Sequence, residues 1–406
     1  MIEREMEYHG SKSIANFIYP NTNSKVVIVK EQRVDGSYTG TRCTKKISPV
    51  LRCTLMGLER GYQVRAPSNQ EQSRYYSINT LNLPSGNIDK PLHSTADSIT
   101  HTLNPWFITG FTDAEGCFSI YVRNKSNSSG SKYYCEAKFD ISLHKKDFSC
   151  LKDIKAYFGG AGSIVKHGEE SIRYTITSVI EIINVVIPHF DKYPLITRKF
   201  IDYQLFKKAV ALIANKEHLT VEGLQKIVTI KASMNRRSLS DELKKSFTDI
   251  VPLPLSECFA LHTIDPEIPN PNWVAGFTSG DGSFMVKVSK SKLSKLGVGV
   301  QLIFQITQHS RDKVLMNSFI SYFGCGRLVE AESSVNFLVT KFSDIKEKIL
   351  PFFQKYPVVG EKFLNYTDWS KVVEIVKNKD HLTHEGLDQI LEIKARLNRN
   401  RPGGDA

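Results

Sequence analysis

The sequence lacks the cysteine spacing of a zinc site or of a disulfide framework. Its seven cysteines are scattered over 406 residues, and their number is odd. None of them falls into a Cys-x-x-Cys pair, which is typical of a protein in a reducing compartment. Long apolar runs are also missing, since no stretch approaches the ~18 to 20 residues that a membrane span needs. We therefore expect neither a disulfide-stabilised secreted protein nor a membrane-spanning one.

Several catalytic and targeting signatures are missing as well. The histidines lie in no metal-binding spacing, and the sequence contains no Walker-type loop and no Ser/His/Asp signature. Residues Gly159–Gly162 are rich in glycine but lead into a strand pattern, which indicates a turn rather than a phosphate cradle. Met1–Gly10 contains three Glu and little apolar character. We expect this segment to be neither a secretory signal nor a basic import peptide.

Negative charge is in deficit. The chain has 54 Lys and Arg against 42 Asp and Glu, a formal net charge of +12, and a pI near 9.2. Such an excess favours a polyanionic partner, with nucleic acid ahead of an anionic membrane surface.

The chain contains the same segment twice. Trp106–Gly116 reads WFITGFTDAEG, and Trp273–Gly282 reads WVAGFTSGDG. Further matched pairs follow at a similar offset: Phe139–Asp147 with Phe304–Asp312, Lys192–Pro194 with Lys355–Pro357, and Asn215–Arg236 with Asn378–Arg399. A period of about 165 residues is too long for a solenoid and indicates a duplicated domain.

Each copy has the residue pattern of an α+β domain. The predicted order is α-β-β-α-β-β-α-α, with an antiparallel sheet that has one apolar and one polar face. Trp106–Glu115 has the apolar face of a helix, and we expect Gly116 to end it in a left-handed conformation. Cys117–Arg123 and Lys138–His144 alternate as strands do, and Asn124–Lys132 between them is typical of a polar hairpin loop. The fold class is thus two tandem half-domains related by a pseudo-twofold axis.

These patterns divide the chain into four regions. Residues 1–100 stand outside the repeat, contain Ser, Asn, Thr and Gly clusters, and are expected to be an extension with little core. Residues 101–236 form the first half-domain and residues 272–401 the second. Residues 237–271 are too many for a tight connection and are expected to be a linker that packs along the surface.

The repeated helices are predicted to pack against each other and to bring two acids together. Small residues four apart on one helix face let two backbones approach closely; here these are Gly110, Ala114, Gly276 and Gly280. Glu115 and Asp281 would then lie side by side at the helix C-termini, where the macrodipole disfavours a carboxylate by ~0.3–1 kcal/mol. A hard divalent cation would neutralise such a pair, and oxygen ligands favour Mg²⁺ or Ca²⁺ over zinc.

The two motifs resemble those of double-motif LAGLIDADG homing endonucleases, the single-chain kind encoded in fungal mitochondrial introns. The resemblance covers roughly residues 104–400 and includes the NKEHLT and NKDHLT segments and the KYP turns. It implies that the motif helices form the interface between two half-domains whose antiparallel sheets make a saddle for DNA. Glu115 and Asp281, with the adjoining Gly116 and Gly282, would bind the metals that cleave both strands across the minor groove.

The family also places a lysine near each metal. Lys199 and Lys362 occupy equivalent positions in the two copies and are the candidates for catalytic lysines. Arg198 competes with Lys199 in the first copy, but its counterpart in the second copy is Glu361, which is acidic.

The strand alternation assigns the polar faces that would contact DNA. In the first half these residues, with two loop lysines, are Ser119, Tyr121, Arg123, Lys125, Lys132, Lys138, Asp140, Ser142, Arg173 and Thr175. In the second half they are Ser283, Met285, Lys287, Ser289, Gln305, Thr307, Asn336 and Thr340, with Lys290 and Lys292 from the polar loop Lys290–Lys295. Side chains of these types can read base edges in the major groove, and basic loops can reach phosphates. Their difference between the halves indicates a long, asymmetric target.

The resemblance implies a monomeric, site-specific DNA endonuclease that promotes intron homing through a staggered double-strand break. It implies Mg²⁺ as the cofactor, Mn²⁺ as a substitute, and Ca²⁺ as an ion that binds without supporting cleavage. The alternative is a maturase that binds its own group I intron RNA, alone or as a second activity. A third interpretation is a DNA-binding regulator without cleavage, although both acids are retained. Leu51–Gln70 also resembles the leaders of fungal mitochondrial intron reading frames, so we expect a mitochondrial protein.

Overall fold

The computed structural model describes residues 103–397, apart from 128–129, 236, 255–266 and 293, together with two strands nearer the N-terminus. These strands, β1 (Val26–Gln32) and β2 (Tyr38–Thr44), pair as an antiparallel hairpin. The chain divides into two compact units, Met1–Ser94 and Thr95–Ala406. The rest of the predicted extension, including Leu51–Gln70, lies outside the described residues.

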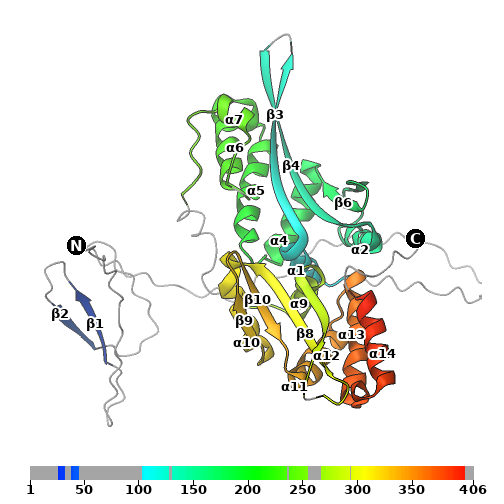
Figure 1. Ribbon diagram of the computed structural model, residues 1–406. Coiled ribbons are helices and arrows are strands. Elements are labelled where there is room, and N and C mark those ends of the chain that lie inside the picture. Colours follow the sequence, from blue (N-terminus) through cyan, green and yellow to red (C-terminus); the bar gives the residue numbers. More distant parts are fainter. Residues whose placement is uncertain are drawn as a thin grey trace, which may run out of the picture. The chain divides into compact units, whose positions relative to one another are not determined.

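The second unit contains two copies of one arrangement (Figure 1). The first copy consists of α1 (Pro105–Glu115), β3 (Gly116–Asn127), β4 (Gly130–His144), α2 (Phe148–Tyr157), β5 (Ser163–Lys166), β6 (Ser171–Ile176), α3 (Val179–Glu181), α4 (Ile187–Lys192), α5 (Lys199–Ala214) and α6 (Val221–Ser233). The second consists of α9 (Pro271–Asp281), β7 (Gly282–Lys290), β8 (Val298–His309), α10 (Lys313–Phe323), β9 (Arg327–Glu330), β10 (Ser334–Val339), α11 (Phe342–Asp344), α12 (Leu350–Lys355), α13 (Glu361–Lys377) and α14 (His384–Arg396). A π-helical segment joins α3 to α4 and α11 to α12 at equivalent positions, Ile182–Val186 and Ile345–Ile349.

The predicted fold class is confirmed. Each copy has a four-stranded sheet of antiparallel pairs, in the orders β3-β4-β6-β5 and β7-β8-β10-β9. Each copy ends with one helix more than the predicted order, α6 and α14, because the matched Asn215–Arg236 and Asn378–Arg399 segments each contain a helix of their own.

Each half-domain has its own apolar core. Aromatic side chains of the strands pack in pairs inside both, as Phe118 with Phe139 and Phe284 with Phe304, and all four are fully buried. The motif helices also contribute across the boundary, since Ala275 of α9 belongs to the first core. The two halves therefore share part of their packing.

The first hairpin is longer than predicted. The predicted loop Asn124–Lys132 is mostly strand, because β3 runs to Asn127 and β4 begins at Gly130. Figure 1 shows the two strands as a long ribbon that extends away from the body of the half-domain. The sequence did not predict these strands because Asn124–Lys132 contains only polar residues and glycine, so no apolar alternation can be read there.

The helices α1 and α9 pack with their backbones in direct contact, as the spacing of small residues predicted. A Cβ added at Gly110 would overlap the carbonyl oxygen of Trp273, and one added at Gly276 would overlap that of Phe107. The predicted left-handed conformation of Gly116 is wrong, since its φ is −75° and its ψ is 154°. Glycine is needed there for another reason: a Cβ would come within 2.8 Å of the Thr112 carbonyl oxygen.

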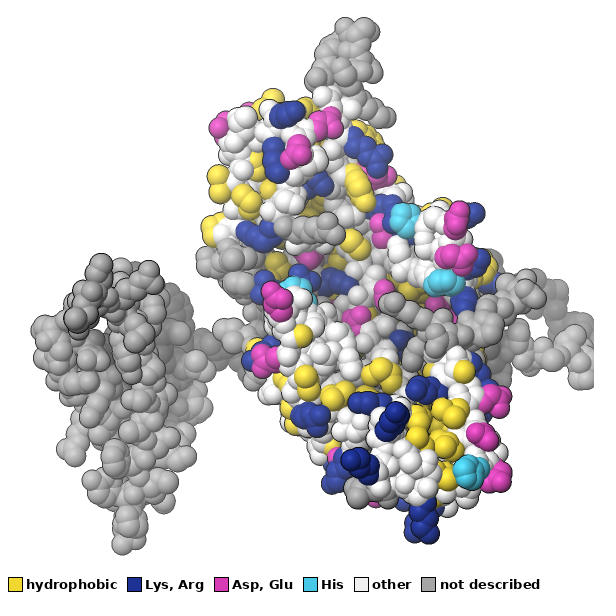
Figure 2. All heavy atoms as spheres, in the orientation of Figure 1, with side chains coloured by type: hydrophobic (Ala, Val, Ile, Leu, Met, Phe, Trp, Pro, Cys, Tyr) yellow, Lys and Arg dark blue, Asp and Glu magenta, His cyan; other side chains and the backbone are white. Residues whose placement is uncertain are grey.

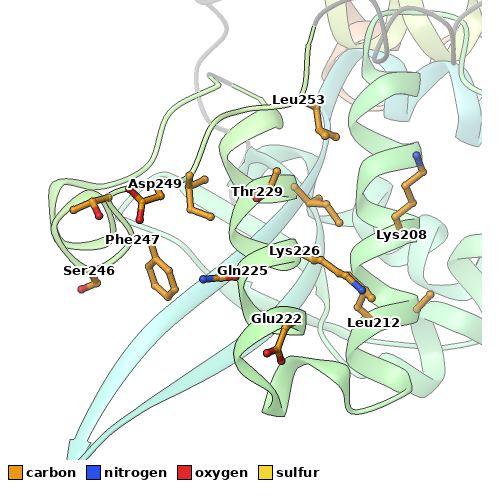
Figure 3. A pocket seen from close by; sticks show the side chains of 14 residues that line it. Lys208, Leu212, Glu222, Gln225, Lys226, Thr229, Ser246, Phe247, Asp249 and Leu253 are labelled. Atoms are coloured by element: carbon orange, nitrogen blue, oxygen red, sulfur yellow. The ribbon is translucent and has the colours of Figure 1, made fainter.

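The described part of the connection after the first half-domain packs on α5 and α6. It contains the short helix α7 (Asp241–Ser246), and Phe247, Ile250 and Leu253 join the edge of the first core. A cavity of about 900 Å³ lies between this segment and the two helices. Figure 3 shows Phe247 and Leu253 on one side of it and Leu212 on α5.

Candidate active site and nucleic-acid interface

The two motif carboxylates lie together at the ends of the packed helices. Glu115 is the last residue of α1 and Asp281 the last of α9, and both are half-buried. A Cβ added at Gly280, the residue before Asp281, would lie 2.9 Å from Cγ of Glu115 and 3.2 Å from its Oε1. The absent side chain at Gly280 therefore makes room for Glu115 beside the other motif.

Burial and mutual repulsion make these carboxylates reluctant to ionise. Burial raises the pKa of Asp281 to about 7, and the charge of Glu115 adds to this rise. Burial also raises the pKa of Glu115, while Lys199 and Lys362 oppose the shift. For both acids, burial outweighs the charges of the two nearby lysines.

The two candidate lysines occupy equivalent places beside this pair. Lys199, at the start of α5, donates through Nζ to the carbonyl oxygens of Thr112 at 2.8 Å and Ala114 at 3.2 Å. Lys362, near the start of α13, donates to the carbonyl oxygen of Gly282.

Burial lowers the pKa of both lysines, and nearby carboxylates oppose the shift. For Lys199 the opposing groups include Asp113, Asp281 and Glu115. For Lys362 they are Glu115, Asp281 and Asp147. Each lysine is thus close enough to both motif acids to interact with them electrostatically.

The residues present suit a hard divalent cation. No cluster of three or more His, Cys, Asp or Glu that could hold a metal occurs among the described residues. The candidate donors are the carboxylates of Glu115 and Asp281 with the adjoining backbone of Gly116 and Gly282, and this set would leave coordination positions for phosphate oxygens and water. Such an incomplete oxygen set is typical of Mg²⁺ that is shared with a phosphate substrate. The raised pKa of Asp281 also fits a cation site, because a bound cation would offset burial and favour the ionised carboxylate.

The stability of the metal-free protein is expected to depend on pH through Asp281. Its pKa is about 7 in the folded state and about 3.9 in an unfolded chain. The folded state thus holds this proton more tightly, and the stabilisation is complete below about pH 4 and is lost as the pH rises through about 7.

We expect the Tm in EDTA to fall from about pH 5 to about pH 8, and Mg²⁺ to restore more of this loss in Tm at the higher pH. Scanning calorimetry with and without Mg²⁺ measures this, and Asp281→Asn should flatten the profile. A Mg²⁺ effect that is the same at every pH would contradict the expectation.

A hollow of about 790 Å³ opens beside Glu115. It lies between the two half-domains, because its lining includes Glu115 and Asp147 of the first half and Glu361 and Lys362 of the second. The candidate site is thus formed by both halves.

Three site residues escaped the sequence analysis. Gln308 donates through Nε2 to Oδ2 of Asp281 at 2.9 Å, and its counterpart in the first copy is Leu143. Asp113 is buried between the halves, and Asp147 lines the hollow. The sequence does mark Gln308, because it is polar at a position of β8 where the alternation of Phe304 and Ile306 predicts an apolar residue. Asp147 had a partial signal, because it matches Asp312 in the repeat, whereas Asp113 had none, since its partners are distant in the sequence.

Most of the strand residues predicted to contact DNA alternate with the buried positions of the sheets, whereas Lys290 is the last residue of β7 and Lys292 follows this strand. In the first half, those with described side chains are half-buried or exposed, except Asp140, which is 6% exposed and lies 3.4 Å from Lys138 Nζ. The side chains of Lys125 and Lys132 are outside the described part. In the second half, Gln305, Thr307 and Asn336 form a hydrogen-bonded group with distances of 2.7–2.9 Å. Thr340 follows the end of β10.

Charge on the surface is mixed. Figure 2 shows Lys and Arg side chains interspersed with Asp and Glu over both half-domains on the face drawn. Around Tyr121 on β3, three cationic groups lie 5.3–5.8 Å from the ring centre: Arg123, Lys138 and Lys231. Within the described residues, no helix is long and apolar enough to cross a membrane.

Fold, duplicated helices and paired acids together define the class of this protein. The family model described as LAGLIDADG endonuclease matches residues 108–210 and 274–373, one match in each half-domain. The chain belongs to the LAGLIDADG endonuclease family.

Individual relatives agree with this assignment. The "Probable intron-encoded endonuclease 3" of Neurospora crassa is 41% identical over 397 residues, which cover 96% of this chain and 69% of that protein. The crystal structure of the I-SmaMI LAGLIDADG homing endonuclease bound to cleaved DNA has a TM-score of 0.70 and 45% identity, and the match covers 74% of this chain and 98% of that one. I-SmaMI bound to an uncleaved DNA target in the presence of calcium ions gives a TM-score of 0.69 at 45% identity, with 73% and 99% covered.

Proposed function

We propose that this protein is a site-specific DNA endonuclease that makes a staggered double-strand break at a long, asymmetric target and so promotes homing of its intron. The observation that carries the proposal is the pairing of Glu115 and Asp281 at the ends of two packed helices, with Lys199 and Lys362 beside them. I-SmaMI, which shares the fold, has been crystallised with cleaved DNA. The relative in N. crassa is named as an intron-encoded endonuclease.

The site chemistry follows from its groups. Carboxylate oxygens of Glu115 and Asp281, with Gly116 and Gly282 adjoining, would hold Mg²⁺, which polarises a phosphate and lowers the pKa of a bound water. Gln308 orients Asp281 through its hydrogen bond. The Nζ groups of the two lysines are held by backbone carbonyls next to the acids. In that position an ammonium stabilises negative charge that develops on phosphate oxygens during cleavage.

The two sheets would bind the duplex through their polar faces. The hydrogen-bonding groups Gln305, Thr307 and Asn336 lie on the polar face of the second sheet. In the first sheet, Tyr121 lies beside Arg123 and Lys138. Different chemistry on the two sheets favours a different base sequence in each half-site. Phosphate contacts by the basic residues would make the affinity depend on salt.

We assign the four regions accordingly: extension 1–100, first half-domain 101–236, linker 237–271 and second half-domain 272–401. Both acids and both lysines lie on one chain, which supports action as a monomer. We propose Mg²⁺ as the cofactor, with Mn²⁺ as a substitute and Ca²⁺ as an ion that permits binding without cleavage. The intron-encoded relative in a fungus supports a mitochondrial location.

The test is cleavage of a plasmid that carries the intron-less host gene. We expect linear product with Mg²⁺ or Mn²⁺, binding without cleavage in Ca²⁺, and no cleavage in EDTA. Because phosphate contacts dominate, the affinity should fall steeply as salt rises. Binding to DNA or intron RNA with no cleavage under any divalent metal would contradict the proposal and favour the maturase.

A further inference from the structure

Two acids outside the motifs connect the half-domains at equivalent positions. Asp147 follows β4 in the first half, and Asp312 follows β8 in the second; the two are matched residues of the repeat. Each stands immediately before a helix of its own half, α2 or α10, where an aspartate commonly caps the helix. Among the described residues, neither aspartate side chain accepts a hydrogen bond from a backbone N–H of the helix that follows it.

Both acids instead accept from a helix of the opposite half. The backbone N–H of Glu361, the first residue of α13, donates to Oδ1 of Asp147 at 2.8 Å. The backbone N–H of Arg198, just before α5, donates to Oδ1 of Asp312 at 2.7 Å. The two hydrogen bonds are equivalent and reciprocal, and each joins residues more than a hundred positions apart.

The helices capped in this way are those that begin at the candidate lysines. Lys199 is the first residue of α5, and Lys362 is the second of α13. We infer that Asp147 and Asp312 are positioning residues that fix each lysine from the opposite half-domain, so that each lysine is placed only when the two halves are assembled. For its catalytic consequence this inference rests on the proposed function.

The two caps are not equally important. At the start of α5, Thr197 also accepts from the N–H of Lys199, at 3.2 Å. Its counterpart before α13 is Gly360, which has no side chain and has a φ of +65°. A Cβ at Gly360 would overlap Oδ1 of Asp147, so glycine there allows the acid to reach the helix. The start of α13 therefore depends more on Asp147 than the start of α5 depends on Asp312.

The test measures the two strand cuts separately under single-turnover conditions with saturating full-length protein, Mg²⁺ and a target labelled on either strand. Loss of a helix cap of this kind changes the equilibrium between the ordered and the disordered helix start by roughly 2- to 30-fold. We expect Asp147→Ala to slow cleavage of one DNA strand roughly tenfold. This should be the DNA strand whose cleavage Lys362→Ala also slows. Asp312→Ala should slow, by roughly threefold, cleavage of the DNA strand whose cleavage Lys199→Ala slows. Nicked plasmid should accumulate, and the Kd for DNA should not change.

Asparagine separates capping from a general structural role. Asp147→Asn and Asp312→Asn keep the accepting oxygen and should restore the cut, because Asn caps helices as well as Asp. The exposed Asp153→Ala on α2 is the surface control and should leave both strands unaffected. Equal slowing of both strands, or a failure of Asn to restore the rate while the lysine variants show strand bias, would overturn the inference.

Hydrogen exchange tests the caps whether or not DNA is cut, which separates this inference from the proposed function. Asp147→Ala should increase amide exchange in the first turn of α13 and leave the first turn of α5 unchanged. Asp312→Ala should do the reverse. Unchanged exchange at both helix starts would overturn the inference even if the enzyme cleaves as proposed.

Discussion

Glu115→Gln and Asp281→Asn are each expected to lower the rate of DNA cleavage on the order of 10³-fold, since a bound metal contributes several kcal/mol to the stabilisation of the transition state. Both substitutions keep the size of the side chain and remove the charge that would hold the cation. DNA affinity should be retained or increase, because one negative charge near the phosphates is lost. Plasmid linearisation in Mg²⁺ and a binding titration in EDTA measure the two properties.

The same variants should stabilise the metal-free protein. Burial and the neighbouring charge raise the pKa of Asp281, so an amide there removes an unfavourable ionisation at neutral pH. An exposed acid such as Asp388 on α14 provides the matched control, and Asp388→Asn should change neither cleavage nor Tm. Cleavage at the wild-type rate by either active-site variant would show that the paired acids are not the metal site.

The duplication explains why so much could be predicted from the sequence. A match in both copies separates the acids of the motifs from a chance Glu-Gly or Asp-Gly pair, and the spacing of Gly110 and Gly276 indicates helix contact. Strand alternation gave the sheet faces wherever the strand packs on a core. It failed for Asn124–Lys132, where every residue is polar or glycine and no alternation can be read.

The features that could not be predicted are those in which the copies differ or exchange contacts. Gln308 has Leu143 as its counterpart, so the comparison of the two copies hid the residue that bonds Asp281. Asp147 and Asp312 match in sequence, but an aspartate before a helix already has a local explanation as a cap. Only the tertiary arrangement shows that each acid accepts from the other half.

Asp113 shows a third kind of asymmetry, and its replacement should cause the largest loss of stability. Each carboxylate oxygen accepts two hydrogen bonds. Oδ2 accepts from Trp273 Nε1 at 2.8 Å and from the N–H of Ile196 at 3.1 Å. Oδ1 accepts from Thr197, through its hydroxyl at 2.5 Å and its N–H at 3.3 Å. One side chain thus joins α1, the segment before Lys199 and the motif helix of the opposite half.

Asp113→Ala is expected to lower the free energy of unfolding by about 3–5 kcal/mol, because it removes the shared acceptor of four donors, of which those of Trp273 and Thr197 belong to buried residues. For a protein of this size that corresponds to a fall in Tm of roughly 10 °C. Burial raises the pKa of Asp113, while hydrogen bonds from Thr197, Ile196 and Trp273 and the charge of Lys199 oppose the shift by favouring the carboxylate. Asp113→Asn should recover half of the loss at most, since its amide nitrogen would face two donors. Calorimetry of both variants measures this.

The second copy provides the control for Asp113. Ser279 occupies the matched position, where its hydroxyl accepts from the N–H of Val359 at 3.1 Å and donates to the carbonyl oxygen of Ala275 at 2.8 Å. Ser279→Ala should therefore cost only about 1 kcal/mol. Since Asp113 holds the residues next to Lys199, the surviving folded fraction of Asp113→Ala should also show slower cutting of the strand assigned to Lys199. Equal destabilisation by the two alanine variants would mean that Trp273 and Ile196 find other acceptors, and that the halves are joined by the helix contact rather than by this carboxylate.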